Sequence, residues 1–270
     1  RPILLDVNKK TLGLCPKSLE DFLEEHCELR NDGFCWNKSS NRRIIACVPM
    51  HTFGFPAQLD EIKLICDRYN IILVEDAAES LGSLYKGYHT GNIGKLSILS
   101  FNGNKIITTG GGGMIITNDS ELAIHAKHIT TTARLSNSLT FEHDEIGYNY
   151  RMTNICAAIG LGQLEVLDER VMQKRKINEY YKNELSSIKE ISFLEEVEIS
   201  FSNFWLTTIL LDTNSAIDRE DLRLHLEKDN IEIRPLWKPM HIQPIFKDCK
   251  SYTNGVSEDL FNRGLCLPSG

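Results

Sequence analysis

Between residues 3 and 119, short apolar segments alternate with stretches of helical periodicity, and this order constrains the fold more than any other feature. Strands are predicted at 3–6 and 44–48, with a helix at 17–25 between them. Residues 31–43 are polar and predict a surface excursion. Strands that alternate with helices pair in parallel, and the helices cover the sheet. The sequence therefore predicts an α/β fold with a mostly parallel sheet.

One helix and strand unit places a charged residue where such folds bind ligands. Apolar side chains recur at helical spacing within residues 58–69, and the run 71–74 predicts a buried strand that is apolar on both faces. This strand ends in Glu75 and Asp76. Open α/β sheets bind their ligands at the carboxyl ends of the strands. Asp76 is therefore a candidate site residue.

The remaining elements divide the chain into two parts. Strands are predicted at 96–101 and 114–117, and helices at 120–129, 154–167 and 169–188. Further along, strands at 204–212 and 231–234 flank a helix that Asp218 caps and that ends at Lys228. This change in character predicts a large domain of residues 1–170 and a smaller α+β domain of residues 171–270.

Composition narrows the classes of function. The formal net charge is −7 and the basic residues are spread evenly, so nucleic acid is not a predicted partner. The longest apolar runs are far too short to span a membrane. The eight cysteines include no Cys-x-x-Cys pair, and Cys47, Cys66 and Cys156 lie in apolar segments that predict burial. We predict a cytoplasmic protein with reduced thiols, without a metal site or disulfides.

Three side chains are the most suited to catalysis. Lys105 lies between a polar turn and an apolar Ile-Ile pair, so desolvation could prepare its amine for a Schiff base; an ordinary exposed turn lysine is the alternative. Asp76 and Glu79 could form an acid and base pair, or one of them could face a cationic heterocycle. They could equally be the first-turn acids of a helix.

Three further patterns are less specific. The run 110–113 consists of four glycines followed by a strand rather than a helix, which disfavours a phosphate loop and favours a tight turn. His125 and His128 have no third ligand at a recognisable spacing, so an exposed helix face is favoured over a metal pair. The segment 234–241 combines cations, a tryptophan and prolines, a mixture suited to a phosphate and a ring, or to a simple turn.

Three segments together carry a resemblance to a known family. They are VEDAAESLGS at 74–83, SFNGNKIITTGGGGM at 100–114 and GYNYRMTN at 147–154. In order, spacing and identity they resemble the pyridoxal-phosphate-dependent nucleotide-sugar aminotransferases of the DegT/StrS family, over nearly the whole chain. The resemblance implies a fold-type-I transferase with a three-layer large domain, working as a homodimer with active sites at the interface. Residues 31–43 and 234–241 are similar to the branch that aminates UDP-linked 4-keto-6-deoxy-N-acetylhexosamines on the route to legionaminic acid and bacillosamine.

The resemblance implies roles for single residues. Lys105 matches the lysine that holds pyridoxal phosphate as a Schiff base and then shuttles the substrate proton. Asp76 matches the carboxylate paired with the pyridine nitrogen, which keeps the ring an electron sink. Glu79 corresponds to a position near the phenolic oxygen of the ring, where many relatives have Gln. Ser100 matches a hydroxyl donor to the cofactor phosphate.

The resemblance also implies contacts beyond the cofactor ring. Asn149 or Arg151 matches the region that reaches across the dimer to the partner's phosphate. The two residues share one face of an extended stretch, so the pattern does not separate them. Lys238 and His241 lie where substrate contacts are expected.

The chain also departs from the family pattern. Relatives carry a Gly-Thr turn that cradles the phosphate, and a stacking aromatic residue, upstream of the equivalent of Ile3; they also carry a terminal helix beyond the equivalent of Gly270. The sequence here begins partway into a predicted strand and ends on turn residues at 266–270, without a closing helix or strand. We therefore expect a fragment of a longer protein, with weak retention of the cofactor.

The leading prediction for function is an aminotransferase that moves an amino group from an amino acid, glutamate first among them, to the keto carbon of a UDP-linked deoxysugar. A sugar dehydratase or isomerase with the same cofactor is the nearest alternative, but the dehydratase branch has histidine in place of the lysine that Lys105 matches. A non-catalytic, truncated or decayed copy that keeps the fold is the other alternative.

Overall fold

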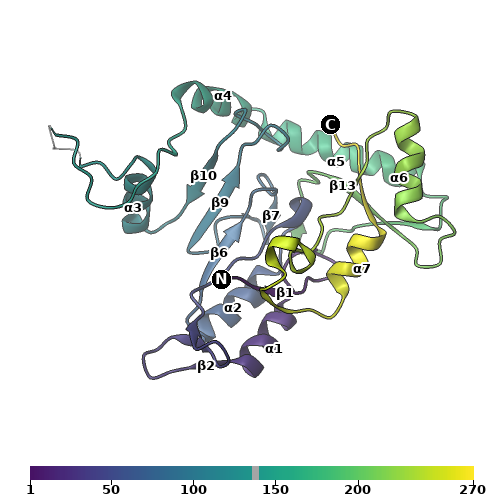
Figure 1. The fold of residues 1–270 in the computed structure, drawn as a ribbon. Coiled ribbons are helices and arrows are strands. Elements are labelled where there is room, and N and C mark those ends of the chain that lie inside the picture. Colours follow the sequence, from purple (N-terminus) through teal and green to yellow (C-terminus); the bar gives the residue numbers. More distant parts are fainter. Residues whose placement is uncertain (136–139) are drawn as a thin grey trace.

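The computed structural model describes residues 1–135 and 140–270, and a four-stranded sheet lies at its centre (Figure 1). The strand order is β10-β9-β6-β5. Strands β5 (Ala46–Cys47), β6 (Ile72–Asp76) and β9 (Leu96–Ser100) run parallel, and β10 (Gly113–Ile116) is antiparallel to β9. The predicted mostly parallel sheet is therefore confirmed. Asp76 and Ser100 end neighbouring parallel strands and so reach the same edge of the sheet.

Two amphipathic helices pack beside this sheet. They are α1 (Pro16–His26) and α2 (Leu59–Arg68), which contact each other. Ile62 and Ile65 form the buried stripe that the helical spacing predicts, and they share a core cluster with Leu73 of β6. Burying a side chain of this size contributes about 1.5–3 kcal/mol, so this cluster holds the helices on the strand that carries Asp76.

Two predictions for the N-terminal part are corrected. Strand β1 (Ile3–Leu5) pairs in parallel with β15 (Lys250–Tyr252) in a separate two-stranded sheet. Residues 31–43 are not a plain excursion, because they contain β3 (Cys35–Asn37) and β4 (Arg42–Arg43), which form an antiparallel sheet with β2 (Cys27–Leu29). The buried Asn37 side chain accepts hydrogen bonds from Ser39 and Ser40 and ties the polar turn to the sheet. The polar composition of this segment does not indicate a hairpin, because its polar residues form hydrogen bonds with one another instead of an apolar pattern.

The C-terminal part contains a second four-stranded sheet. Its strands, in spatial order, are β11 (Ile191–Phe193), β13 (Thr207–Leu211), β16 (Gly264–Leu267) and β14 (Arg234–Pro235). Its helices are α6 (Arg219–Lys228) and α7 (Val256–Arg263). As predicted, Asp218 caps α6, because its carboxylate accepts from the amide of Asp221 at 2.8 Å.

Two expectations for this part are wrong. The chain was expected to close without a strand, whereas β16 is a central strand in which all four residues are buried. A short apolar run between Gly and Pro cannot be assigned by periodicity alone, which is why the pattern missed it. The strand predicted at 231–234 is reduced to the two residues of β14. A further small sheet joins β12 (Ser200–Phe201) to the hairpin of β7 (Leu84–Tyr85) and β8 (Tyr88–His89).

The boundary predicted near residue 170 falls within α5 (Leu167–Glu184), a long helix that runs towards the second sheet (Figure 1). The largest core cluster draws on both sides of this boundary, since Leu99 and Phe101 share it with Val171 and Trp205. The two parts are therefore joined by common packing. The division into domains 1–170 and 171–270 stays a prediction.

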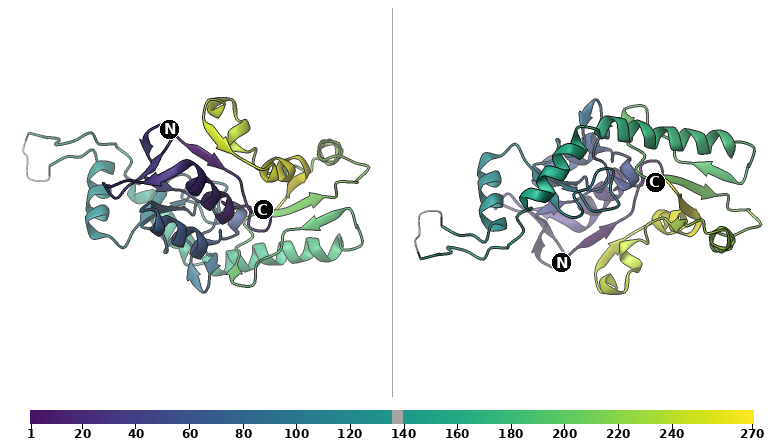
Figure 2. Two further views of the ribbon diagram at one scale, coloured as in Figure 1. Left: turned by 90° about the horizontal axis from the view of Figure 1, so that it is seen from below. Right: turned by 90° about the horizontal axis from the view of Figure 1, so that it is seen from above.

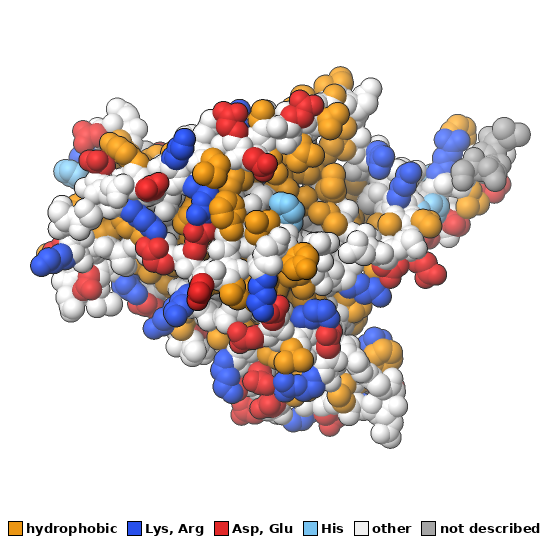
Figure 3. All heavy atoms as spheres, turned by 180° about the vertical axis from the view of Figure 1, so that it is seen from behind, with side chains coloured by type: hydrophobic (Ala, Val, Ile, Leu, Met, Phe, Trp, Pro, Cys, Tyr) orange, Lys and Arg blue, Asp and Glu red, His pale blue; other side chains and the backbone are white. Residues whose placement is uncertain are grey.

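A projecting arm carries α3 (Ser120–Thr130) and, among the residues that the structure describes, 131–135 and 140–151 (Figures 1 and 2). Beside the arm, α4 (Asn154–Leu164) buries none of its side chains in the part of the chain that the structure describes. Figure 3 shows hydrophobic side chains gathered near the arm. The exposed large apolar residues of β10 and α4 are Met114, Ile115, Ile155, Ile159, Leu161 and Leu164. Exposed apolar patches are common at the surfaces through which proteins contact a partner.

The cysteines lie partly in the core and partly nearer the surface. All eight are free thiols, and Cys47 and Cys66 are buried as predicted. The predicted burial of Cys156 is wrong, because it lies on α4 and is only half-buried. Within residues 1–135 and 140–270, no helix has both the length and the apolar character that crossing a membrane requires.

Candidate active site

A cavity of about 630 Å³ lies at the end of β6. Its wall contains four predicted site residues, namely Asp76, Glu79, Lys238 and His241. Other side chains in the wall are Met50, Thr52, Phe53, Trp237 and Ser257. Residues more than a hundred positions apart in the chain therefore meet at one cavity, which sequence spacing cannot show.

Asp76 is held at the cavity by its backbone. Its amide donates to the carbonyl of Pro49 at 2.9 Å, and its carbonyl accepts from the amide of His51 at 3.0 Å. The Asp76 Oδ1 atom accepts from the amide of Ala78 at 3.1 Å. These bonds fix the turn after β6 and leave the carboxylate in the cavity wall. A carboxylate in this position can hold a cationic ring nitrogen through a charge-assisted hydrogen bond.

A buried pair, His51 and Glu75, supports the turn from the core. The Glu75 carboxylate accepts from the amides of Gly91, Ile93 and Gly94 at 2.5 to 2.7 Å and lies 3.1 Å from His51 Nε2. His51 Nδ1 accepts from the amide of Ala57 at 3.0 Å, so the ring proton lies on Nε2 and points to Glu75. Burial raises the pKa of Glu75, but these hydrogen bonds outweigh it and hold the pKa below its ordinary value.

Glu79 lies deeper in the site than Asp76. The exposed fraction of its side chain is 8%, and its Oε2 accepts from the amide of Phe53 at 2.8 Å. Its Oε1 accepts from the indole of Trp237 at 3.1 Å. Phe53 adopts a left-handed backbone (φ 55), an uncommon conformation for a bulky residue, and this aims its amide at the carboxylate. Burial raises the pKa of Glu79, against the opposing effects of the Phe53 amide, Lys105 and Trp237.

This raised pKa predicts a pH-dependent stability. Between the ordinary Glu pKa of 4.5 and the raised value, the folded protein binds more protons at Glu79 than the unfolded chain does, so this contribution is lost as pH rises. We expect Glu79→Gln to gain unfolding free energy relative to the natural chain as pH rises from 5 to 8. Urea denaturation at several pH values measures the difference. Glu179→Gln, on the exposed face of α5, is the matched control, and an E79Q difference that is flat or falls with pH would contradict the assignment.

Lys105 lies in the turn after β9, at the sheet edge that also carries Asp76. Its Nζ lies 3.6 Å from Glu79 Oε1 and 4.1 Å from the centre of the Trp205 ring. The side chain is 14% exposed, so the amine is largely withdrawn from water. Lys105 does not line the cavity itself and meets it at Glu79. The exposed-turn alternative for Lys105 is thus excluded by its surroundings.

Ser100 and the glycine run complete this edge. Ser100 is the last residue of β9, and its Oγ accepts from the amide of Asn102 at 3.4 Å. Gly110 (φ 81) and Gly112 (φ 121) have positive φ, and the carbonyl of Gly112 accepts from the amide of Phe101 at 2.9 Å. The run therefore folds as the predicted tight turn and returns the chain into β10.

The remaining predicted residues divide between the cavity and the arm. His241 is largely buried, and its Nε2 lies 2.9 Å from Glu258 Oε1, whereas Lys238 is exposed at the cavity rim. Asn149 and Arg151 are exposed on the arm, away from the cavity wall. The structure does not bring these two to the other candidates within one chain. Their role across a dimer stays a prediction.

The arm also carries the histidines that the sequence singled out. His125 Nε2 lies 3.0 Å from Glu145 Oε1, and His128 Nε2 lies 2.6 Å from Asp144 Oδ1. The potential ligand atoms of His128, Asp144 and Glu145 lie within 4.8 Å of one another. These imidazole–carboxylate contacts tie α3 to residues 144–145 of the arm, and the metal-free interpretation stays a prediction.

Sequence reasoning missed two residues of the site. Trp205 faces the Lys105 amine, and Phe53 supplies a backbone amide to Glu79. Trp205 was assigned only to a strand, and its aromatic character beside a polar Ser-Asn pair is the one signal that could have marked it. Phe53 contributes through its backbone, so no side-chain pattern could have identified it.

The residues present fit pyridoxal phosphate. Lys105 offers a partly desolvated amine, Asp76 a carboxylate at the strand end, and Ser100 a hydroxyl at the end of the next strand. The indole of Trp237 and the ring of Phe53 lie 5.1 Å apart in the cavity wall and give it an aromatic side. An amine for a Schiff base beside a carboxylate for a pyridinium nitrogen is the donor set that this cofactor requires.

The profile of the DegT/DnrJ/EryC1/StrS aminotransferase family matches residues 1–270. The chain is 43% identical over 273 residues to EpsN of Bacillus subtilis (strain 168), provisionally named a pyridoxal phosphate-dependent aminotransferase. This match covers 100% of the chain and 67% of EpsN. It is 41% identical to the GDP-perosamine synthase of Escherichia coli O157:H7, over 86% of this chain and 61% of that protein. The chain thus spans about two thirds of the length of these relatives.

The fold is also that of solved members of this family. A crystal structure of a DegT DnrJ EryC1 StrS aminotransferase from Brucella abortus has a TM-score of 0.86 and 24% identity, and the match covers 100% of this chain and 68% of that one. This likeness confirms the fold-type-I α/β architecture that the sequence predicts. By fold, by profile and by the residues at the end of β6 and β9, the chain belongs to the DegT/DnrJ/EryC1/StrS aminotransferase family, whose cofactor is pyridoxal phosphate.

Proposed function

We propose that the whole protein is a nucleotide-sugar aminotransferase that moves an amino group from glutamate to the keto carbon of a UDP-linked 4-keto-6-deoxy-N-acetylhexosamine. One observation carries the proposal: the Lys105 amine lies 3.6 Å from the buried Glu79 carboxylate, on the same sheet edge as Asp76. Family membership supports a nucleotide sugar as the amino acceptor, and the residues at 234–241 support the acetamido sugar.

The side chains divide the work in this proposal. Lys105 would hold the cofactor carbonyl and move the proton at the amine-bearing carbon of the substrate. Asp76 would hold the pyridine nitrogen in its charged form, and Ser100 would donate to the phosphate. The cofactor supplies an electron sink for the negative charge that develops when that proton leaves. Lys238 and His241 come from the C-terminal part of the chain and line the same cavity as Asp76, and in this proposal they orient the sugar nucleotide.

Glu79 has a separate role in the proposal. Its carboxyl group faces the Lys105 amine and is fixed by two donors, the Phe53 amide and the Trp237 indole. By resemblance, Glu79 occupies a position near the phenolic oxygen of the ring, where many relatives have Gln. Burial raises the pKa of its carboxyl group, so this carboxyl group loses its proton less readily than an exposed one.

The proposal includes a homodimer in the cytoplasm. The exposed apolar residues of β10 and α4 lie beside the arm that carries Asn149 and Arg151. An apolar surface flanked by an exposed cation suits a contact with a second copy, and a partner's phosphate would satisfy Arg151 or Asn149. The eight free thiols suit a reducing compartment.

A GDP-linked keto sugar is the second candidate acceptor, and the 41% identity to a GDP-perosamine synthase favours it. The discriminating experiment gives the full-length protein pyridoxal phosphate, ¹⁵N-glutamate and either UDP- or GDP-linked keto sugar. Mass spectrometry and NMR then locate the label. We expect ¹⁵N on the sugar ring, with at least about tenfold higher kcat/KM for the UDP substrate, which corresponds to 1.4 kcal/mol. A deoxygenated product without ¹⁵N would indicate a dehydratase. A tenfold higher kcat/KM for the GDP-linked keto sugar would mean that the acceptor is the GDP-linked sugar.

A further inference from the structure

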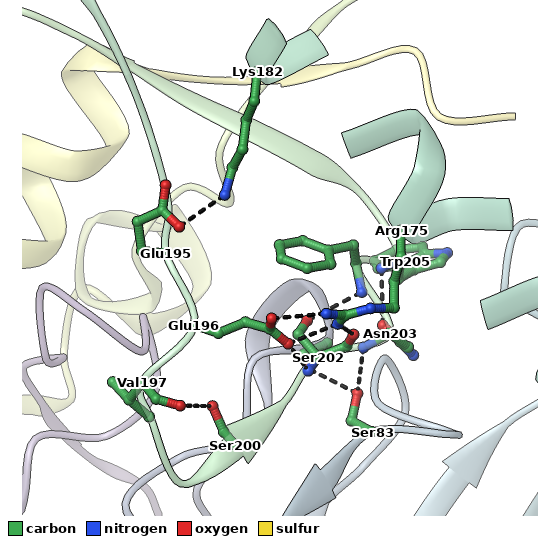
Figure 4. Close-up of polar contacts among 12 residues, drawn as sticks. Ser83, Arg175, Lys182, Glu195, Glu196, Val197, Ser200, Ser202, Asn203 and Trp205 are labelled. Carbon is green, nitrogen blue, oxygen red and sulfur yellow. Dashed lines mark hydrogen bonds and ion pairs between the residues drawn. The ribbon is translucent and has the colours of Figure 1, made fainter. Parts of the chain in front are cut away.

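The segment that precedes β13 lies against Ser83, in the loop after β6 (Figure 4). It also bonds to the turn carrying Glu79. The side-chain amide of Asn203 donates to the carbonyls of Glu79 at 3.0 Å and Leu81 at 2.9 Å. The backbone amide of Asn203 donates to Ser83 Oγ at 2.9 Å. Asn203 is fully buried, and a Cβ on Gly54 would stand 1.9 Å from its Oδ1, so glycine is required there for this close approach. Segment and turn therefore form one unit.

Arg175 of α5 fixes the same segment from the other side (Figure 4). Its guanidinium makes a bidentate pair with Glu196 at 2.7 and 2.9 Å and donates to the carbonyl of Ser202 at 2.6 Å. It also lies 4.1 Å from the Phe201 ring centre and 5.1 Å from that of Phe204. A planar cation that is paired and stacked at once is strongly held.

Phe204 turns the chain between these anchors and the site. Its backbone is left-handed (φ 45), a conformation that costs free energy for a bulky residue and persists only where the surroundings enforce it. Its amide donates to Ser202 Oγ at 3.0 Å, and the next amide, that of Trp205, donates to Asn203 Oδ1 at 2.8 Å. This turn directs the Trp205 side chain at the loop after β9.

Trp205 contacts Lys105 in two ways. Its ring centre lies 4.1 Å from the Lys105 amine, and its indole N–H donates at 2.7 Å to the carbonyl of Asn104, the residue before Lys105. The side chain is 2% exposed. The N–H therefore fixes the backbone from which Lys105 departs, while the ring face attracts the ammonium, an interaction that strengthens when water is excluded.

We propose that Trp205 is a positioning residue, which holds the Lys105 amine between its indole face and the Glu79 carboxylate and thereby keeps it beside the cavity wall at Glu79. Arg175 and Asn203 fix Trp205 in this position from α5 and from the Glu79 turn. This inference goes beyond the proposed function. The contacts that hold the amine exist without the cofactor, and only their use in catalysis rests on the proposed function.

The test measures the reactivity of Lys105 with a small amine-directed reagent in the cofactor-free full-length protein, by peptide mass spectrometry over time. We expect Trp205→Leu to raise the labelling rate of Lys105 by about tenfold, as the ring and the Asn104 bond are both lost. Trp205→Phe keeps a ring face and loses the N–H, so an intermediate rate is expected. The half-buried Lys174 in the same protein reports general loosening and should keep its rate.

Trp36→Leu is the matched control. Trp36 also faces a cation, Arg30, at 4.7 Å and also donates through its indole to Asp32, but it lies on β3 away from the cavity. The inference is overturned if Lys105 labelling in both Trp205 variants stays within about twofold of the natural chain, a difference too small for a lost cation–π contact. It is also overturned if Lys174 accelerates in parallel, which would mean a structural role.

A second readout separates this inference from the proposed function. Borohydride reduction with limiting pyridoxal phosphate should place a pyridoxyl group on Lys105 of the natural chain and several times less of it in Trp205→Leu. If the natural chain shows no label on Lys105, the proposed function fails while the labelling-rate comparison still stands. If the label is unchanged in the variants and the labelling rates are too, the positioning role fails alone.

Discussion

Replacing Lys105 with arginine is expected to lower the aminotransferase rate of the full-length protein by about 10⁴-fold, the upper range for loss of a proton-transferring group. Arginine keeps a cation near Glu79 and Trp205, so the surroundings of the site should be preserved. A guanidinium stays protonated in proteins and cannot form the Schiff base. The loss therefore reports the chemistry of the amine rather than a lost ion pair.

Two measurements check the effect of Lys105→Arg. Product formation with glutamate and keto sugar gives the rate, and borohydride reduction followed by peptide mapping shows whether any lysine carries a pyridoxyl group. Lys63→Arg is the control, because Lys63 is a half-exposed lysine of α2 paired with Asp67 at 2.6 Å. Residual activity in K105R within tenfold of the natural chain, or a label on another lysine, would refute the assignment.

Asp76→Asn is the second large effect that we expect, with kcat reduced by about 10³-fold, as for the loss of one strong electrostatic contact in an active site. Asparagine has the same shape, and its oxygen can still accept from the amide of Ala78. In the proposed role of Asp76, the substitution removes the negative charge that would hold the pyridine nitrogen protonated. Without that charge the ring would be a weaker electron sink, so the rate is expected to fall although the cavity is unchanged.

The measurements for Asp76→Asn separate chemistry from folding. Urea denaturation should show an unfolding free energy within about 1 kcal/mol of the natural chain, since no buried hydrogen bond is lost. The absorbance spectrum of the bound cofactor should change with the protonation of its ring nitrogen. Asp67→Asn on the exposed part of α2 serves as the control. An unchanged kcat in D76N would mean that another residue holds the ring nitrogen.

Much of the α/β framework follows from the sequence. Local patterns predict the stripe of α2, a strand at 71–74 that is observed as β6 at 72–76, and the cap at Asp218, because period and capping are properties of neighbouring residues. The predicted burial of both faces of this strand is not complete, because Ile72 is exposed. The position of Asp76 at the carboxyl end of its strand also followed. The pairing of β6 with β9, which brings the turn of Lys105 to the same edge, is shown only by the structure. For Trp237 and His241, the sequence offered only a suitable composition and a family resemblance, and the structure shows that both residues line the cavity.

The failures have a common physical reason. The pairing of β1 with β15, the buried strand β16 and the hairpin at Asn37 all depend on partners that are distant in the chain or on side chains that satisfy a turn. Cys156 is only half-buried, and its burial depends on which segments pack against α4, which a local sequence pattern cannot predict.

By itself, the sequence determined the layered α/β class, the strand-end acid at 76, the amine at 105 and the family to which they belong. The tertiary structure alone decided that Glu79 loses its water, that Phe53 turns an amide towards it and that Trp205 covers the lysine. Local spacing sets which groups a strand can present, but solvent exclusion and the contacts of a buried charge arise only when remote segments pack around it.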